Sequence, residues 1–181
     1  MKPRINLSPA FLAALLVVVL TGCAHDDWRT ASRESASLAP DPVATREAVL
    51  QVYGADAFSW RGTIAIHTWI AVKRTNEQYY TVYDVVGWRE RSGKDVMQIQ
   101  QDIPDRYWYG AMPKVLKEFR GKGTDALIAK VDQAARNYPW KHEYAAFPGP
   151  NSNTFVGWIG RQVPELELEL PFSAIGSGYD D

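Results

Sequence analysis

The stretch RGTIAIHTWIAVK, residues 61–73, alternates between two sets of side chains along its whole length. An alternation with a period of two predicts a β-strand whose two faces meet different surroundings. One face would carry Ile64, Ile66, Thr68, Ile70 and Val72, and the other His67, Trp69, Ala71 and Lys73. His67 and its neighbour Thr68 are therefore expected on opposite faces of the strand.

The segments around this strand predict further strands. Asn76–Glu77 is typical of a turn, and residues 79–88 (YYTVYDVVGW) contain enough β-branched and aromatic side chains to form an antiparallel partner. A first strand is predicted within residues 44–55, an aromatic strand around Tyr107, and a further strand over 143–147. The pattern indicates a hairpin within a largely antiparallel sheet.

Two segments toward the C-terminus predict helices. Thr124 is a suitable N-cap for a helix whose apolar residues recur with helical spacing as far as Tyr138–Pro139. After Pro148-Gly149-Pro150, Asn151 is a natural N-cap for a second helix. Residues 165–170 then alternate between Glu and Leu. We predict an α+β fold with a mostly antiparallel sheet and two or three helices.

Residues 1–22 have the three parts of a secretory signal peptide. Lys2 and Arg4 precede an apolar run over 10–20, which is shorter than the about 20 residues of a bilayer-spanning helix. Leu20-Thr21-Gly22-Cys23 then resembles the lipobox of bacterial lipoproteins. The resemblance implies cleavage before Cys23, a diacylglycerol on its thiol and acylation of the new amino group. Cys23 would then anchor the mature protein in a membrane.

The mature chain is predicted to be one domain on a tether. Residues 24–41 are polar and rich in small side chains, so we expect a lipidated tether over 23–41 and a single globular domain over 42–181. Ala24 stands where, in lipoproteins of diderm bacteria, an aspartate favours retention in the inner membrane. We therefore predict a lipid-anchored protein of the outer membrane that faces the periplasm.

The composition argues against several classes of partner and cofactor. Without Lys2 and Arg4 the formal charge falls from −1 to −3, and there is no basic run, so nucleic acid is not an expected partner. Cys23 is the only cysteine, which excludes an intramolecular disulfide and a zinc site built from thiolates. His25 and His142 lack the spacing of metal ligands, and neither a metal nor a cofactor is expected.

Aromatic side chains are abundant, with seven Trp and nine Tyr. Several lie in clusters, such as Tyr107-Trp108-Tyr109 and Tyr138-Pro139-Trp140. Aromatic residues most often fill cores, but their rings also form platforms for sugars or apolar chains. Trp69, Trp140 and Tyr109 are candidates for the lining of an aromatic groove.

Three stretches together resemble a family of bacterial lipoproteins known only as a domain of unknown function. They are WRGTIAIHTWIAVK at 60–73, YPW and the later PGPNSNTF between 138 and 155, and LPFSAIG at 170–176. The resemblance covers about residues 49–179. It implies membership of a family but no activity.

A second resemblance is to circularly permuted papain-like proteins, among them NlpC-like and lecithin:retinol acyltransferase-like members. They share a histidine on an early strand and a late Asn-Cys-Asn-polar-Phe motif, where this chain has Asn-Ser-Asn-Thr-Phe at 151–155. The resemblance implies a permuted papain-like fold with Ser152 as a nucleophile at a helix N-terminus, where backbone N–H groups stabilise an oxyanion. An alcohol is not ionised there as a thiol is, so His67 would take its proton, and Asp84 or Tyr83 would orient the imidazole.

Two functions from different classes follow. In the first, a papain-like hydrolase or acyltransferase uses Ser152 and His67 on an amide or ester of a cell-wall peptide or a lipid, which requires the two side chains within about 4 Å. In the second, a non-catalytic envelope module binds a glycan, peptide or lipid in the aromatic groove, with Asn151 and Asn153 beside it. A structural interpretation also stays open, because PGPNSNTF is a competent turn and helix cap and His67 can be a core histidine.

Overall fold

The computed structural model describes residues 27–180. The chain divides into two units, residues 1–31 and a compact unit that starts at Ser32. The predicted signal peptide over 1–22 and the lipidation site Cys23 lie outside the described residues. In the first unit, the carbonyl oxygen of Asp27 accepts hydrogen bonds from Thr30 N and Ala31 N, at 3.0 and 2.9 Å, and so forms a turn. Over residues 27–180, no helix has the length and apolar character needed to span a membrane.

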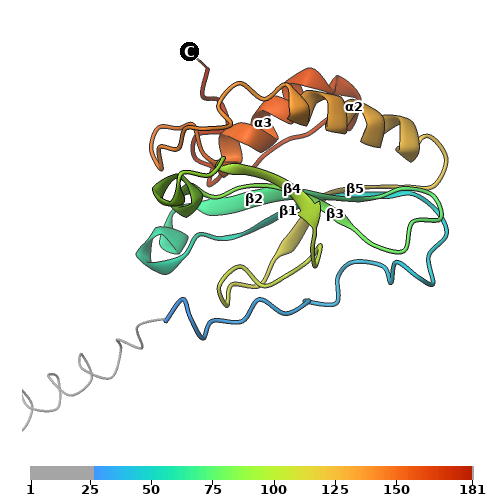
Figure 1. Ribbon diagram of the computed structural model, residues 1–181, viewed down its shortest axis with the longest axis horizontal. Helices are drawn as coiled ribbons and strands as arrows, with labels where there is room; N and C mark the ends of the chain where they lie inside the picture. Colours follow the sequence, from blue (N-terminus) through green and yellow to red (C-terminus); the bar gives the residue numbers. More distant parts are fainter. Residues whose placement is uncertain (1–26, 181) are drawn as a thin grey trace, which may run out of the picture. The chain divides into compact units, whose positions relative to one another are not determined.

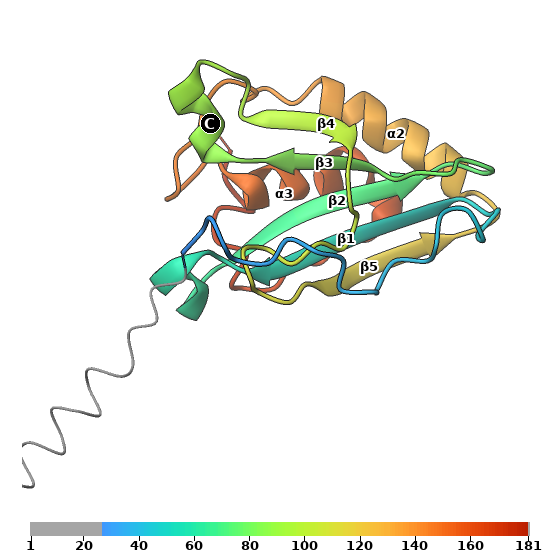
Figure 2. The same cartoon turned by 60° about the horizontal axis from the view of Figure 1, so that its bottom comes forward.

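A five-stranded antiparallel sheet forms the centre of the compact unit (Figure 2). Its strands are β1 (Val49–Asp56), β2 (Ile66–Lys73), β3 (Thr81–Val85), β4 (Met97–Gln101) and β5 (Lys114–Arg120), in the spatial order β4-β3-β2-β1-β5. The predicted hairpin is confirmed as β2 and β3, in which Ile70 pairs with Tyr83. The sheet and the helices described next confirm the α+β class.

Two α-helices cover one face of the sheet (Figure 1). They are α2 (Thr124–Arg136) and α3 (Ser152–Gln162), and the short 3₁₀ helix η3 (Pro164–Leu166) follows α3. Fully buried apolar side chains from both layers meet between them, among them Leu50, Val52, Ile70, Ile128, Val131, Phe155 and Ile159. Each such side chain contributes roughly 1.5–3 kcal/mol of hydrophobic stabilisation, so this layer is the main core of the protein.

Helix α3 begins at Asn151, as predicted. Asn151 Oδ1 accepts hydrogen bonds from Asn153 N and Thr154 N, at 2.9 and 3.1 Å, and Thr154 Oγ1 accepts one from Asn151 N at 3.1 Å. This reciprocal capping box satisfies backbone donors that the first turn leaves without partners. The prediction for α2 was wrong by one residue, because Thr124 is already helical and follows Gly123, whose φ of 88° suits glycine.

Irregular chain covers the other face of the sheet, where residues 32–41 run beside the loop between β4 and β5 (Figure 2). Asp105 joins the two segments, because its carboxylate accepts hydrogen bonds from Ser35 Oγ at 2.8 Å and from the backbone N–H groups of Leu38 and Ala39. The last part of the predicted tether is therefore folded. The compact unit starts at Ser32 and not at residue 42, since these backbone donors find a buried carboxylate.

Two of the predicted strands are absent. The segment around Tyr107 turns instead of extending, because Tyr109 and Gly110 have φ angles of 50° and 90°, and Trp108 makes a single bridge with Ala111. Residues 143–147 also form no strand, since Ala145 N donates to the carbonyl oxygen of Pro150 and closes a turn. The sheet instead contains two strands that were not predicted, β4 with the sequence MQIQQ and β5 with the sequence KVLKEFR.

Candidate functional site

Strands β2 and β3 bring His67 and Asp84 together on the face without helices. Ile70 pairs with Tyr83, and both side chains belong to the core on the helix side of the sheet. Because successive residues of a strand point to opposite faces, His67 and Asp84 point away from the helices. His67 Nε2 lies 2.9 Å from Asp84 Oδ1. The Tyr83 hydroxyl donates to Asp132 Oδ1 of α2 at 3.0 Å. Of the two predicted partners for the imidazole, Asp84 is therefore the one that meets it.

Arg106 completes a buried charge cluster with Asp84. Its Nη2 donates to Asp84 Oδ2 at 2.7 Å, and its Nη1 donates to Asp102 Oδ2 at 3.0 Å. Burial by itself raises the pKa of Asp84, but the charge and hydrogen bond of His67 and the charge of Arg106 outweigh it, so the pKa lies below its usual value. Asp84 is therefore a carboxylate at neutral pH that has two side-chain partners and no exposure to solvent.

Aromatic rings stack on this cluster. Trp108 lies flat against the His67 imidazole, with ring centroids 3.5 Å apart and planes within 5° of parallel. Trp88 and Tyr109 contact Trp108 in turn, at centroid distances of 5.7 and 5.1 Å. The Arg106 guanidinium also lies 5.7 Å from the Trp108 ring. The buried charges therefore support Trp108, and Trp108 supports the partly buried Tyr109 and the exposed Trp88.

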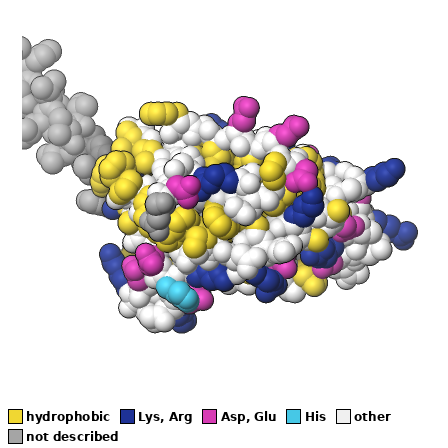
Figure 3. Space-filling view, turned by 90° about the horizontal axis from the view of Figure 1, so that it is seen from above, with side chains coloured by type: hydrophobic (Ala, Val, Ile, Leu, Met, Phe, Trp, Pro, Cys, Tyr) yellow, Lys and Arg dark blue, Asp and Glu magenta, His cyan; other side chains and the backbone are white. Residues whose placement is uncertain are grey.

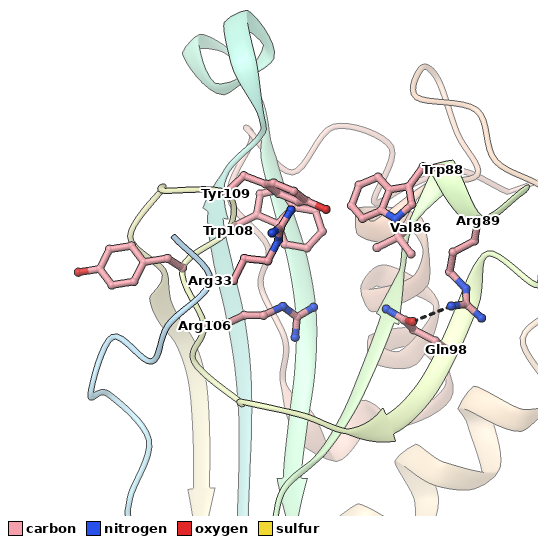
Figure 4. A pocket seen from close by; sticks show the side chains of 9 residues that line it. Arg33, Val86, Trp88, Arg89, Gln98, Arg106, Trp108 and Tyr109 are labelled. Atoms are coloured by element: carbon pink, nitrogen blue, oxygen red, sulfur yellow. Dashed lines mark hydrogen bonds between the residues drawn. The ribbon is translucent and has the colours of Figure 1, made fainter. Parts of the chain in front are cut away.

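A small pocket lies between the rings of Trp108 and Tyr109 and the 3₁₀ helix η2 (Gly87–Ser92), which carries Trp88 (Figure 4). We call it the aromatic–arginine pocket and define it by its lining residues Arg33, Val86, Trp88, Arg89, Gln98, Arg106, Tyr107, Trp108 and Tyr109. In Figure 4 the side chains of Arg33, Arg106, Trp108 and Tyr109 face those of Val86, Trp88 and Gln98. The cavity between them measures about 100 Å³, which is less than the about 300–1,000 Å³ of drug-sized ligand sites, so it has room for part of a ligand.

The three arginines of the pocket are held in different ways. Arg89 donates to the carbonyl oxygen of Asp95 at 2.6 Å and to Gln98 Oε1 at 3.1 Å. The Arg33 guanidinium lies over the Tyr109 ring, 4.2 Å from its centroid. Tyr109 itself has a left-handed φ of 50°, which is unfavourable for a bulky side chain. Among residues 27–180 no acidic side chain lines the pocket, so the described lining presents positive charge and aromatic surface.

A family model described as "Protein of unknown function (DUF3750)" matches residues 47–179. The chain belongs to this family. No curated protein and no solved structure matches the chain. The match includes all five strands, both α-helices and every pocket residue except Arg33. It confirms the predicted resemblance to an uncharacterised family, whereas the resemblance to papain-like proteins stays a prediction.

The DUF3750 domain does not bring Ser152 and His67 together. Thr68 Oγ1 donates to the Ser152 carbonyl oxygen at 3.3 Å and to Asn153 Oδ1 at 2.9 Å. The first turn of α3 therefore lies against the helix face of β2, and His67 points to the opposite face because successive strand residues alternate. Within residues 27–180, no hydrogen bond joins the Ser152 hydroxyl to His67. The predicted nucleophile and base are separated by the sheet.

The other predicted polar residues support the fold. Besides its role as N-cap, Asn151 donates from Nδ2 to the carbonyl oxygens of Ala146 and Ile175, each at 3.2 Å. Asn153 donates from Nδ2 to the carbonyl oxygens of Ile66 and Ile175, each at 2.9 Å. These bonds join α3, β2 and the C-terminal segment, and they place neither amide in the aromatic–arginine pocket.

Of the three aromatic residues predicted to line a groove, Tyr109 lines the pocket. Trp69 is fully buried, and its Nε1 donates to the carbonyl oxygen of Pro104 at 2.7 Å. Trp140 lies among the core residues of the helix side, with its ring 5.6 Å from that of Tyr138. Both tryptophans are therefore core residues in the DUF3750 domain.

Sequence reasoning missed Trp88, Arg33 and Arg106. Trp88 follows a glycine at the end of the strand predicted over 79–88, and nothing in the local pattern pairs it with Trp108, twenty positions later. Arg33 lay in the presumed tether.

In the part of the chain that the structure describes, no three His, Cys, Asp or Glu side chains gather as metal ligands would.

Proposed function

We propose that this protein is an envelope lipoprotein, anchored in the outer membrane through Cys23, whose DUF3750 domain binds a ligand without transforming it. The observation that carries the binding function is the aromatic–arginine pocket. Its rings are held in place by buried charges, and its lining includes three arginines. Rigid aromatic surface with a few fixed polar groups is what small-ligand sites offer.

The ligand that suits this lining is a sugar that carries a carboxylate. Trp88, which is 48% exposed and packs on the buried Trp108, offers apolar ring surface for a sugar, and Arg33 brings a positive charge to the pocket wall. Arg106 donates to Asp84 and Asp102 and lies 5.7 Å from the Trp108 ring, so we assign it the role of positioning Trp108. Fragments of peptidoglycan combine amino sugars with carboxylates, and they are the class we propose.

The arrangement of His67 favours binding over acyl transfer. A serine nucleophile needs a base within hydrogen-bonding reach, and the base must present a free nitrogen. One imidazole nitrogen of His67 is bonded to Asp84, the ring is covered by Trp108, and Ser152 lies on the far side of the sheet. Hydrolysis or acyl transfer through Ser152 remains the alternative hypothesis.

Calorimetric titration of the purified, lipidated full-length protein with soluble disaccharide-peptides from peptidoglycan tests the binding function. Trp88→Ala should weaken binding at least tenfold and leave the melting temperature unchanged, because Trp88 is 48% exposed. Tyr79→Ala is the matched control, since Tyr79 is 42% exposed in the β2–β3 turn outside the pocket, and it should bind as the wild type does. If the uncharged chitin disaccharide bound as tightly as the disaccharide-peptide, the carboxylate would have no role in binding.

The same sample separates binding from catalysis. After incubation, mass spectrometry should return the disaccharide-peptide unchanged. A cleaved or acyl-transferred product that Ser152→Ala no longer forms would refute the binding function and support the hydrolase. Intact-mass measurement of the protein should also show a diacylglycerol and an amide-linked acyl chain on Cys23, and density-gradient fractions should place it with the outer membrane.

A further inference from the structure

Four large apolar side chains are exposed near one end of the sheet. Trp60, Ile64, Phe147 and Phe172 are 68, 59, 78 and 103% exposed. Trp60 lies in the 3₁₀ helix η1 (Ser59–Thr63), Ile64 follows it, and the other two lie in loops before and after α3. We call this set the apolar end. Figure 3 shows hydrophobic side chains gathered at the left of the molecule, which is the end where η1 lies in Figure 1.

Hydrogen bonds tie these separate segments to one another. Ile66 N donates to the carbonyl oxygen of Ser173 at 3.0 Å, which places Phe172 beside the start of β2. Asn151 Nδ2 donates to the carbonyl oxygens of Ala146 and Ile175, which places Phe147 beside the same C-terminal segment. The apolar end is therefore a surface assembled by the fold, and its members are not scattered at random over the protein.

The chain that leads to Cys23 leaves the compact unit at this end. Ser32, the first residue of that unit, accepts a hydrogen bond from Gly110 N at 3.0 Å through its carbonyl oxygen. The ring of Tyr109 lies 5.4 Å from that of Phe58, which directly precedes η1. Ser32 is nine positions after Cys23, so an extended chain between them reaches roughly 30 Å at most.

We infer that the apolar end docks on the surface of the bilayer that holds the acyl chains of Cys23. This inference rests on the lipidation proposed above. A short tether keeps the domain at a high effective concentration beside the bilayer, so a small apolar surface is enough for docking. Indole rings favour the headgroup region, and Ile and Phe side chains favour the acyl boundary below it. The Arg61 guanidinium, 5.3 Å from the Trp60 ring, lies where lipid phosphates would be.

Docking can be measured by quenching of Trp60 fluorescence. The lipidated full-length protein is reconstituted in vesicles of phosphatidylethanolamine and phosphatidylglycerol, part of which carry brominated acyl chains. Bromine quenches an indole only at short range, so quenching that Trp60→Phe removes reports contact of this ring with the bilayer. We expect such quenching in the wild type. The triple variant Ile64→Ser, Phe147→Ser, Phe172→Ser should lose it, and these exposed positions should tolerate serine without unfolding.

A matched control changes exposed apolar residues at the other end of the sheet. Tyr79 lies in the turn after β2, an eight-residue strand of roughly 25 Å, and Val43 precedes Arg46, whose carbonyl oxygen accepts from Asn76 N in that turn. Val43→Ser with Tyr79→Ser should keep the quenching of Trp60. Lipidated Cys23 without quenching of Trp60 would overturn docking and leave the anchor intact, whereas an unmodified Cys23 would overturn both. Loss of a dimer in the triple variant, with no quenching in the wild type, would assign this surface to a second copy of the chain and also refute docking.

Discussion

The substitution Asp84→Asn removes the central charge of the cluster beneath the pocket. Asp84 is fully buried and accepts from His67 Nε2 at 2.9 Å and from Arg106 Nη2 at 2.7 Å. In the variant, the Arg106 guanidinium keeps only Asp102, whose side chain is 30% exposed. A buried cation then loses its buried partner, which is the costly way to break an ion pair.

The expected loss of stability is large for a single substitution. Removal of one partner of a buried pair costs about 3–5 kcal/mol, and we expect the lower end because the asparagine oxygen can still accept one hydrogen bond. For a domain of this size, each kcal/mol lowers the melting temperature by about 2–4 °C, so the variant should melt roughly 6–12 °C below the wild type.

The loss should depend on pH in a defined direction. The pKa of Asp84 is lowered in the folded protein, so its carboxylate stabilises the fold above the unfolded pKa of about 3.9. This contribution disappears as the pH falls through the lower, folded pKa. The difference between wild type and Asp84→Asn should therefore be complete at pH 6–7 and shrink below about pH 4.

Urea unfolding followed by tryptophan fluorescence measures both effects. Glu47→Gln is the control, because Glu47 forms a surface ion pair with Arg120 at 2.8 Å with both side chains about 40% exposed, and it should cost less than about 1 kcal/mol. The reasoning fails if Asp84→Asn costs no more than this control at pH 7. It also fails if the difference between Asp84→Asn and the wild type grows as the pH is lowered.

Two further predictions concern α3. Asn151→Ala should lower the free energy of unfolding by about 1–2 kcal/mol because the capping box is lost, whereas Ser152→Ala should change it by about 0.5 kcal/mol or less. Urea titrations compare the two, and an equal loss would contradict the structural role assigned to Asn151. Gly157→Ala should destabilise the protein by about 1–3 kcal/mol, although alanine favours helices, because the new methyl group would collide with the carbonyl oxygen of Ser177. A raised melting temperature for Gly157→Ala would show that the contact between α3 and the C-terminal segment is loose.

The strands and caps that could be predicted are those with a local signal. The alternation of residues 61–73 predicts a strand and assigns His67 and Thr68 to different faces. The structure confirms the faces and the strand over Ile66–Lys73, whereas the start of the predicted strand lies in η1 (Ser59–Thr63). Asn151 has the side chain and the spacing to Thr154 that a capping box requires, and it caps α3. In each case, the residues that form the interaction lie within a few positions of one another.

The elements that could not be predicted depend on distant partners. Strand β5 contains four charged side chains in seven residues, and it forms a strand because it pairs with the edge of β1. The segment around Tyr107 has a composition typical of strands, but it turns because Asp105 binds residues 35–39 and Trp108 covers His67. The intrinsic β-propensity of a segment does not predict which of these distant partners it will bind.

The sequence by itself determined the secretory and lipobox pattern, the α+β class and the opposed directions of His67 and Thr68, since these follow from local composition and from the geometry of a strand. Only the tertiary structure decided which face of β2 the helices cover. That decision brings Thr68 to the first turn of α3 and leaves His67 with Asp84 and Trp108 on the other face. The physical reason is that the choice of face depends on how much apolar surface is buried in total by segments far apart in the chain. A local sequence pattern does not contain this information.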